Sequence, residues 1–277
     1  MRTLSLLAGL FLVSSVNAQV VQQQLIELIA LYNDHQALKL PLPDSQALTE
    51  LTTGGVVILS ERVSNSPEQD DQIRVVGYRL YQRPRTIVWV AALYKPLNPN
   101  GRIIEHITAG EAGGYELYQY LPVPWPIKDR HWTITVDKAV ALAVSTGDKI
   151  WEHHWRLTPN GELRMRRMVA QGLLPRLDEK RFKQAVYLPR NQGGWTAFKV
   201  NDNLTLLASH VSTVLSGWIP DSFVAAYTRR RVDTMMGEID RFAATVHRSY
   251  DPEHFLVFSG SGEPIYPTEL RPEAKND

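Results

Sequence analysis

The feature that most constrains this chain is a proline-rich segment that reads LPVPWPIKDRHWTITV, at Leu121–Val136. Proline fixes φ and removes a backbone donor, so the three prolines cannot lie inside a sheet and predict a rigid extended corner. From His131 onward the pattern alternates, with Trp132, Ile134 and Val136 on one face. The segment therefore predicts a stiff corner that leads into a half-buried strand.

Many short strands and one long helix are expected around this corner. The strands are predicted at Val56–Val63, Ile73–Tyr81, Arg102–Thr108, Tyr115–Leu121, Lys149–Leu157, Leu163–Ala170, Gln184–Leu188, Trp195–Val200 and Thr205–Leu215. Helices are predicted at Val20–Tyr32, Asp44–Leu51 and Arg85–Leu93, and the longest at Pro220–His247. Tight turns favour an antiparallel sheet, and the long amphipathic helix needs a surface that buries its apolar stripe. We predict an α+β fold in which a curved antiparallel sheet wraps around the C-terminal helix and leaves an internal hydrophobic cavity.

The N-terminus has the pattern of an export signal. Arg2 precedes an apolar run, Leu4–Val13, and Val16-Asn17-Ala18 fits a cleavage site, so residues 1–18 are predicted to be a signal peptide. We expect a periplasmic or secreted protein with a helical extension at 19–53, one domain at 54–250 and a partly disordered tail at 251–277. The chain contains no cysteine, which excludes disulfides and thiolate chemistry.

Charge and motifs exclude several function classes. Lys and Arg number 30 against 29 Asp and Glu, a balance that argues against a nucleic-acid partner. The sequence has no nucleophile elbow, no P-loop and no His-Glu-x-x-His. His153 and His154 would point to opposite faces of a strand and cannot share one metal ion. We therefore predict no catalytic residue, no metal and no cofactor.

Polar residues on otherwise apolar strand faces are the candidate ligand contacts. His153 lies between Trp151 and Trp155, and Arg167 lies between Met165 and Val169 on the predicted strand Leu163–Ala170. A charge facing a core is costly unless it is paired, so an internal ion pair or an exposed strand end would explain Arg167. The alternative is a polar contact to a lipid head group in an apolar cavity.

Two charged groups allow the same choice between structure and function. Asp129 and Arg130 would form a salt bridge that pins the proline corner. Arg229-Arg230-Arg231 on the terminal helix is expected to be a solvated face, with contact to anionic lipids as the alternative.

The corner also resembles the motif of one known family. Pro124-Trp125-Pro126 followed by Asp129-Arg130 looks like the Pro-Trp-Pro and Asp-Arg signature of START domains, the steroidogenic acute regulatory protein-related lipid-transfer family. The stretch from Ser216 through Gly217 to Pro220 resembles the Gly-x-Ile-Pro entry to that family's C-terminal helix. The likeness spans roughly Gly54–Tyr250. His131 stands where the family often has an acidic residue, and Trp218 replaces a smaller one.

The resemblance implies a helix-grip fold with a hydrophobic tunnel for a sterol, phospholipid or fatty-acid-like ligand, and transient contact with a membrane. The predicted ligand-binding residues are Trp132, Trp151, His153, Trp155, Met165, Arg167 and Tyr227. The predicted structural motif is Pro124, Trp125, Pro126, Asp129, Arg130, Gly217 and Pro220. Residues 216–221 are the expected lid, because Gly217 permits motion before Pro220. The alternatives are an aromatase/cyclase-type enzyme of the same superfamily and an envelope interaction module without a ligand.

Overall fold

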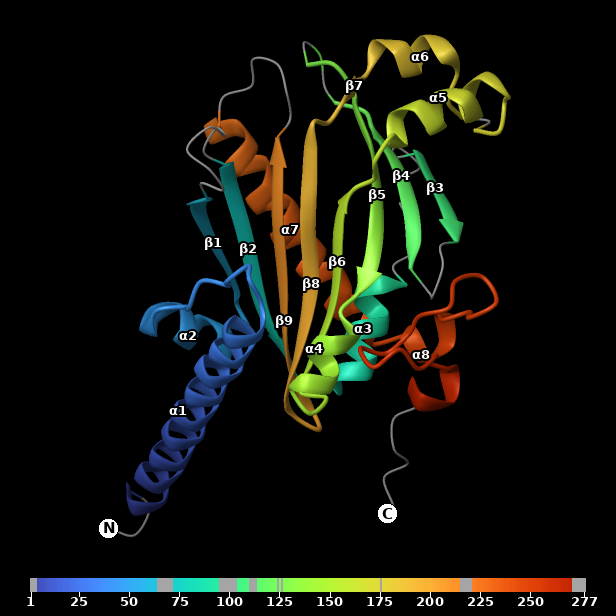
Figure 1. Ribbon diagram of the computed structural model, residues 1–277. Helices are drawn as coiled ribbons and strands as arrows, with labels where there is room; N and C mark the ends of the chain where they lie inside the picture. The colour runs from blue at the N-terminus through green and yellow to red at the C-terminus, as the bar shows by residue number, and fades with distance from the viewer. Residues whose placement is uncertain are drawn as a thin grey trace.

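A single curved antiparallel sheet organises the molecule (Figure 1). The computed structural model describes residues 4–63, 72–94, 104–109, 114–123, 125, 127–174, 176–214 and 221–270. The strands are β1 (Val56–Val63), β2 (Gln72–Tyr81), β3 (Ile104–Ala109), β4 (Tyr115–Leu121), β5 (Arg130–Lys138), β6 (Ile150–Leu157), β7 (Val186–Tyr187), β8 (Arg190–Asn201) and β9 (Leu204–Val214). Their order is β1-β2-β9-β8-β6-β5-β4-β3, and β7 adds to β5 in parallel. The predicted α+β class and antiparallel sheet are confirmed.

The face of the sheet that holds the C-terminal helix is called the inner face below. Helix α7 (Asp221–Ala243) packs on this face against β1, β2 and α3 (Arg85–Leu93). Gly77 on β2 allows the close approach, because a Cβ there would lie only 2.3 Å from Cγ1 of Val232. The Tyr81 hydroxyl donates to the Met236 carbonyl (2.9 Å), and the Arg79 guanidinium pairs with Asp240 (2.7 Å). The sheet therefore holds the helix along one half of its inner face.

The opposite, outer face is covered at one end by N-terminal helices. Helix α1 (Leu4–His35) and helix α2 (Ser45–Thr52) pack there, with α4 (Val140–Ser145) beside them. The Asp44 side chain caps α2 at the Ala47 N–H, as predicted. The Tyr32 hydroxyl donates to the buried Glu152 carboxylate (2.6 Å) and ties α1 to the sheet. Helix α1, and not α7, is the longest helix, and it runs through the predicted cleavage site; cleavage after Ala18 stays a prediction.

The other end of the outer face carries two helices where the sequence predicts strands. Helix α5 (Gly161–Ala170) and helix α6 (Glu179–Gln184) occupy this region, so the predicted strand Leu163–Ala170 is wrong. Met165 and Val169 are four residues apart and both buried, a spacing that places them on one face of a helix. The stretch fits a period of two and of 3.6 alike, and packing on β5 decides for the helix.

The predicted strand Gln184–Leu188 shrinks to the two residues of β7. Gly193-Gly194, predicted to separate two strands, lies within β8.

The C-terminal segment is packed and not disordered as far as Leu270. Helix α7 ends at Ala243, four residues before the predicted end. It is followed by helix α8 (Val246–Ser249) and a 3-10 turn, Pro267–Leu270. Ile265 and Leu270 are fully buried, and the Tyr250 hydroxyl donates to the Ile265 carbonyl. The predicted disorder of the tail is wrong for this part of the chain. No helix among the described residues is long and apolar enough to cross a membrane.

Candidate functional site

The candidate site is an apolar wall on the inner face of β3 to β6, on the half of the sheet away from the packing of α7 on β1 and β2. The inner wall is defined as Ile107, Tyr115, Leu117, Trp132, Ile134, Val136, Trp155 and Leu157. Leu117, Ile134 and Val136 are buried, whereas the remaining five side chains are half-buried. The alternation predicted for β5 is confirmed, because Trp132 and Val136 lie on this wall.

Hydrogen bonds fix the two tryptophans of the wall. The Trp132 Nε1 donates to Gln119 Oε1 (2.9 Å), and Gln119 Nε2 donates to Glu105 Oε1 (2.5 Å). The Trp155 Nε1 donates to Asn191 Oδ1 (3.1 Å). Gly193 leaves room for the Trp155 ring, since a Cβ there would lie 2.4 Å from it. The polar edges of both rings are therefore satisfied within the sheet, and their apolar faces remain for packing or for a ligand.

His153 is a buried polar group at the edge of this wall. Its side chain is 6% exposed, and neither ring nitrogen has a hydrogen-bond partner in the described part of the chain. Its ring lies edge-on to Trp89 (5.2 Å between centroids) and at a tilt to Tyr115 (6.5 Å). Burial, together with the charges of Lys138 and His154, lowers the pKa of the imidazole to about 3. The imidazole is therefore neutral near pH 7 and offers one N–H donor and one acceptor nitrogen.

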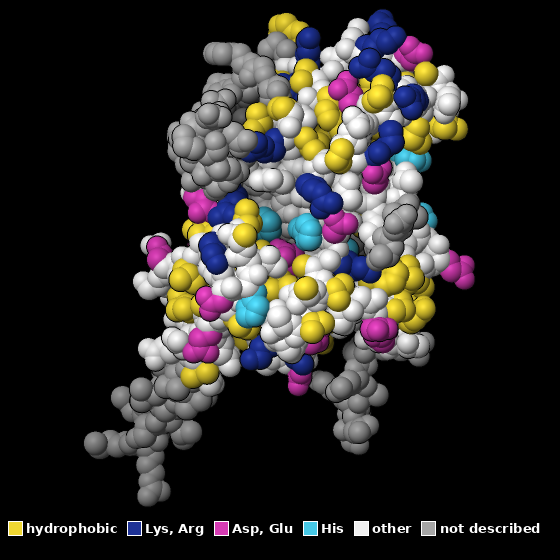
Figure 2. Space-filling view, viewed as in Figure 1, with side chains coloured by type: hydrophobic (Ala, Val, Ile, Leu, Met, Phe, Trp, Pro, Cys, Tyr) yellow, Lys and Arg dark blue, Asp and Glu magenta, His cyan; other side chains and the backbone are white. Residues whose placement is uncertain are grey.

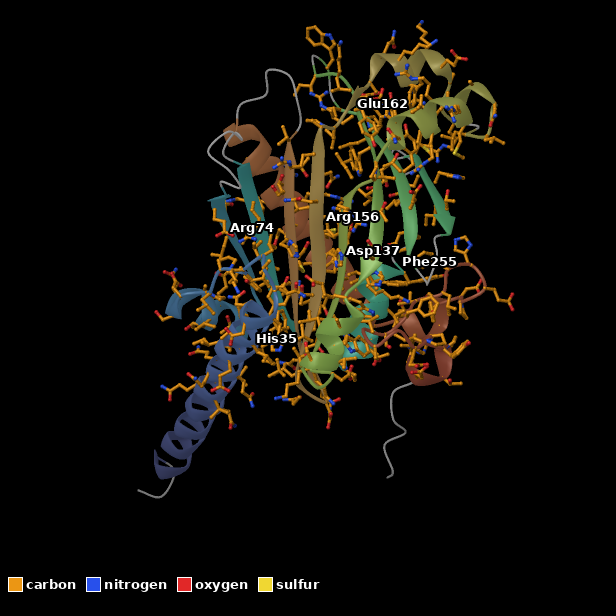
Figure 3. The ribbon with its side chains drawn as sticks, viewed as in Figure 1. His35, Arg74, Asp137, Arg156, Glu162 and Phe255 are labelled. Carbon is orange, nitrogen blue, oxygen red and sulfur yellow. The ribbon has the colours of Figure 1, made fainter. Side chains whose placement is uncertain are left out.

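The C-terminal segment closes one side of this region. Phe255, labelled in Figure 3, reaches the start of β4 and contacts Tyr115 edge-on at 5.4 Å. The Trp89 Nε1 donates to the Phe258 carbonyl (2.8 Å). The segment predicted to be a tail thus forms part of the boundary of the candidate site.

Four of the predicted ligand-binding residues come together on the inner face. Trp132, His153 and Trp155 border the wall, and Trp151 packs into the adjoining core with the Arg85 guanidinium 3.7 Å from its ring centroid. Trp151 Nε1 donates to Asp148 Oδ1 (2.6 Å).

The structure separates the other predicted contacts from this group. Met165 is buried beneath α5 on the outer face, and Arg167 is exposed on the same helix. The prediction that Met165 and Arg167 share a strand face with a ligand is wrong, because both lie on a helix across the sheet. Tyr227 belongs to α7, but its side chain lies outside the described residues, as do Pro124, Pro126, Gly217, Pro220 and the predicted lid up to Pro220.

The proline corner is fixed by Asp129. Its carboxylate accepts from the Val123 N–H (2.9 Å) and from the Tyr120 hydroxyl (2.5 Å), and the buried Arg130 donates to the Lys128 carbonyl (2.5 Å). The anchoring role predicted for Asp129 is therefore served by these two bonds. Trp125, between the prolines, is 91% exposed.

Sequence reasoning missed several residues around His153. Lys138 on β5 lies directly opposite His153 on β6 in the strand register. It is the next residue in the alternation Trp132, Ile134, Val136, so it lies on the same face of the sheet. Tyr115 starts β4 opposite Val136. Continuing the alternation by one step could have found Lys138, whereas the contribution of Trp89 from α3 needs the tertiary structure.

A surface cavity of about 230 Å³ lies elsewhere, at the end of β2. Arg79, Arg83 and Asp240 are among its lining residues, and none of the inner wall is. This cavity is not the predicted hydrophobic tunnel.

Comparison with known proteins identifies the architecture. No protein-family model matches the sequence, and no curated protein matches it. Human STARD10 matches with a TM-score of 0.50 and 9% identity, over 79% of this chain and 86% of that one. Human StAR-related lipid transfer protein 5 matches with a TM-score of 0.49 and 13% identity, over 84% of this chain and 99% of that one. A STAR-related lipid transfer protein fragment from Xanthomonas axonopodis matches with a TM-score of 0.48 and 16% identity, over 69% of this chain and 94% of that one. This chain therefore has the helix-grip fold of START domains.

Proposed function

We propose that this protein binds a hydrophobic ligand, a lipid, against the inner wall and shields it from water without catalysing a reaction. The observation that carries this proposal is the inner wall itself. It presents two half-buried tryptophan rings, with their indole N–H groups already bonded, next to a buried histidine that has no hydrogen-bond partner among the described residues. Ligand sites in proteins combine an apolar lining with a few polar groups that fix orientation.

Binding rather than catalysis fits the surroundings of His153. Among the described residues, no carboxylate or hydroxyl hydrogen-bonds to either ring nitrogen. A general base normally has such a group to orient it. We therefore assign His153 to ligand contact.

The test of ligand binding is lipid extraction and native mass spectrometry of the purified protein. We expect a co-purifying lipid in the wild type and less of it in Trp155→Ala, which removes a half-buried ring from the wall. Val144→Ala is the matched control, because Val144 is 71% exposed on α4. Empty wild-type protein that also takes up no added lipid would contradict the proposal.

We also propose transient membrane contact through the corner and α5–α6. Trp125 is almost fully exposed, and the Val186 N–H donates to the Asp129 carbonyl, which places the corner beside the end of α6. Residues 160–190 carry eight Lys and Arg against three Asp and Glu. Figure 2 shows Lys and Arg side chains gathered over α5 and α6, with hydrophobic side chains among them. Basic side chains and an interfacial tryptophan together favour an anionic lipid surface.

Vesicle flotation tests this contact. We expect binding to vesicles that contain phosphatidylglycerol, weaker binding to pure phosphatidylcholine, and a loss in Trp125→Ala but not in Val144→Ala. Equal binding of both variants would contradict the assignment of this surface.

Export is a further part of the proposal and rests on the signal-like pattern of residues 1–18. The mature N-terminus should be Gln19 when the full chain is produced in a bacterial host and recovered from the periplasm or medium. Recovery of the intact chain from the cytoplasm would contradict it.

A further inference from the structure

His153 is a buried donor and acceptor that has no hydrogen-bond partner within the residues that the structure describes. Nearly all buried polar groups in folded proteins are hydrogen-bonded, and an exception needs a physical explanation. The ring is oriented by Trp89 and Tyr115, so its nitrogens are held in place by packing and not by bonds. A bound polar group would supply the missing partner.

Lys138 is the neighbour that determines what this polar group is. Lys138 and His153 are directly opposite in the β5–β6 register, and cross-strand pairs of this kind hold their Cβ atoms about 5 Å apart. The Lys138 ammonium lies 3.7 Å from the centroid of the Phe258 ring. Within the described part of the chain, no carboxylate forms an ion pair with it. A cation–π contact alone offsets only part of the free energy that it costs to remove an ammonium charge from water.

Two of the indole donors near His153 are already used. Trp89 Nε1 donates to the Phe258 carbonyl, and Trp151 Nε1 donates to Asp148. Among the described residues, the imidazole N–H of His153 and the Lys138 ammonium have no anionic or hydrogen-bonding acceptor, so both are available to a ligand. Two donors and one positive charge match the two oxygens and single charge of a carboxylate. A hydroxyl would leave the ammonium unpaired, and a phosphate dianion would bring more charge and more acceptors than the site satisfies.

The acidic residue on the same face does not disturb this match. Glu105 accepts from Gln119 Nε2, and its charge raises the pKa of Tyr115 together with burial. It is not among the charges that shift His153, which are Lys138 and His154.

We propose that the ligand is an amphiphile with a carboxylate head group, of the fatty-acid class, whose carboxylate is bound by Lys138 and His153 while its chain lies along the inner wall. This inference rests on the proposed function, since it names the head group of the ligand that the wall would hold.

The test is a head-group series with one chain length. Dodecanoate, dodecanol and dodecyl phosphate are titrated into the full chain by isothermal titration calorimetry at pH 8, below their aggregation concentrations. We expect dodecanoate to bind about 10- to 100-fold more tightly than dodecanol, the range of one charge-assisted hydrogen bond. Dodecyl phosphate should bind more weakly than dodecanoate.

Two variants test whether Lys138 and His153 cause the preference for dodecanoate over dodecanol. Lys138→Met keeps the length of the side chain and should lower dodecanoate affinity about tenfold or more while leaving dodecanol within threefold. His153→Phe keeps the ring and should also weaken dodecanoate. Lys149→Met, exposed just before β6, is the control and should bind like the wild type.

Each outcome separates this inference from the proposed function. Equal binding of dodecanoate and dodecanol by the wild type would overturn the carboxylate assignment while leaving a lipid-binding protein. Tightest binding of dodecyl phosphate would also overturn it. Binding of none of the three would contradict the proposed function as well. The wild-type series decides even where a variant fails to fold.

Discussion

Two buried histidines lie on neighbouring strands and opposite faces of the sheet. His131 on β5 faces outward beneath α6, and His153 on β6 faces inward beside the wall. They are 1% and 6% exposed. Burial lowers the pKa of His131 to about 4 and that of His153 to about 3, so both are neutral near pH 7.

Their partners distinguish them. His131 Nδ1 lies 3.2 Å from the Tyr118 hydroxyl, and its ring lies edge-on to Phe182 (4.6 Å) and Tyr187 (5.2 Å). His153 has aromatic neighbours, but none of the described residues hydrogen-bonds to it. Burial and charge state alone would give both residues the same role. Hydrogen bonding separates them: the outer-face histidine has a hydroxyl partner, whereas the inner-face one has none among the described residues.

The largest effect expected on the outer side is that of Met165→Ala. Met165 is 4% exposed in the core formed by α5, α6 and β4, and truncation of a buried methionine costs about 2 to 5 kcal/mol of unfolding free energy. Urea denaturation measures the loss, and lipid affinity per folded molecule should not change. Met168→Ala, half-buried on the same helix, is the control and should cost less. A selective loss of lipid affinity in Met165→Ala would break the separation between the two faces.

Acid should destabilise the protein through both histidines. Each has a folded pKa below its ordinary value of about 6.5, so the unfolded chain binds more protons at acid pH. Their contribution is complete above pH 6.5 and falls as the pH drops toward about 4 for His131 and about 3 for His153. Between pH 7 and 5 the expected loss is about 2 kcal/mol for each histidine.

His153→Phe removes one of these titrations. Urea denaturation at pH 7, 6 and 5 should show a shallower pH dependence in this variant than in the wild type. A variant with the wild-type slope would mean that His153 is protonated as readily in the folded protein as in the unfolded chain.

Exchanging each histidine for phenylalanine at pH 7 contrasts their partners directly. His131→Phe leaves the buried Tyr118 hydroxyl unpaired and should lower the unfolding free energy by about 1 to 3 kcal/mol. His153→Phe removes two unpartnered nitrogens and should raise it by about 1 kcal/mol. Such a gain would be typical of a site held ready for function at the expense of stability. Equal losses in both variants would contradict the comparison.

Most of the fold could be predicted from the sequence because its patterns are local. The alternation in β5 and β6, the Asp44 cap and the helical spacing in α7 each depend on near neighbours. The segment Gly161–Ala170 could not be assigned in this way, because its apolar spacing satisfies strand and helix alike and only packing on β5 selects the helix. The order of the C-terminal segment could not be predicted for a related reason. Its buried residues, such as Ile265 and Leu270, are too widely spaced in the sequence to indicate a packed core.

The candidate site was only partly predictable. The strand pattern places Trp132, His153 and Trp155 on one face, because alternation fixes the direction of side chains. Trp89 and Phe258 come from distant segments, and no local pattern connects them to His153. The unpartnered state of His153 is a property of the assembled core and leaves no trace in the sequence.

The smallest effect on stability should come from Arg167→Ala, which tests the side of the sheet on which lipids are recognised. Arg167 is exposed on α5, so its loss should change the unfolding free energy by less than about 0.5 kcal/mol. Dodecanoate affinity should also stay at the wild-type value, because the inner wall lies across the sheet. Binding to anionic vesicles should fall about fivefold, since each basic side chain near such a surface contributes about 1 kcal/mol. A drop in dodecanoate affinity without a change in vesicle binding would mean that α5 reaches the ligand, and the division of the molecule into a structural outer face and a ligand-binding inner face would be wrong.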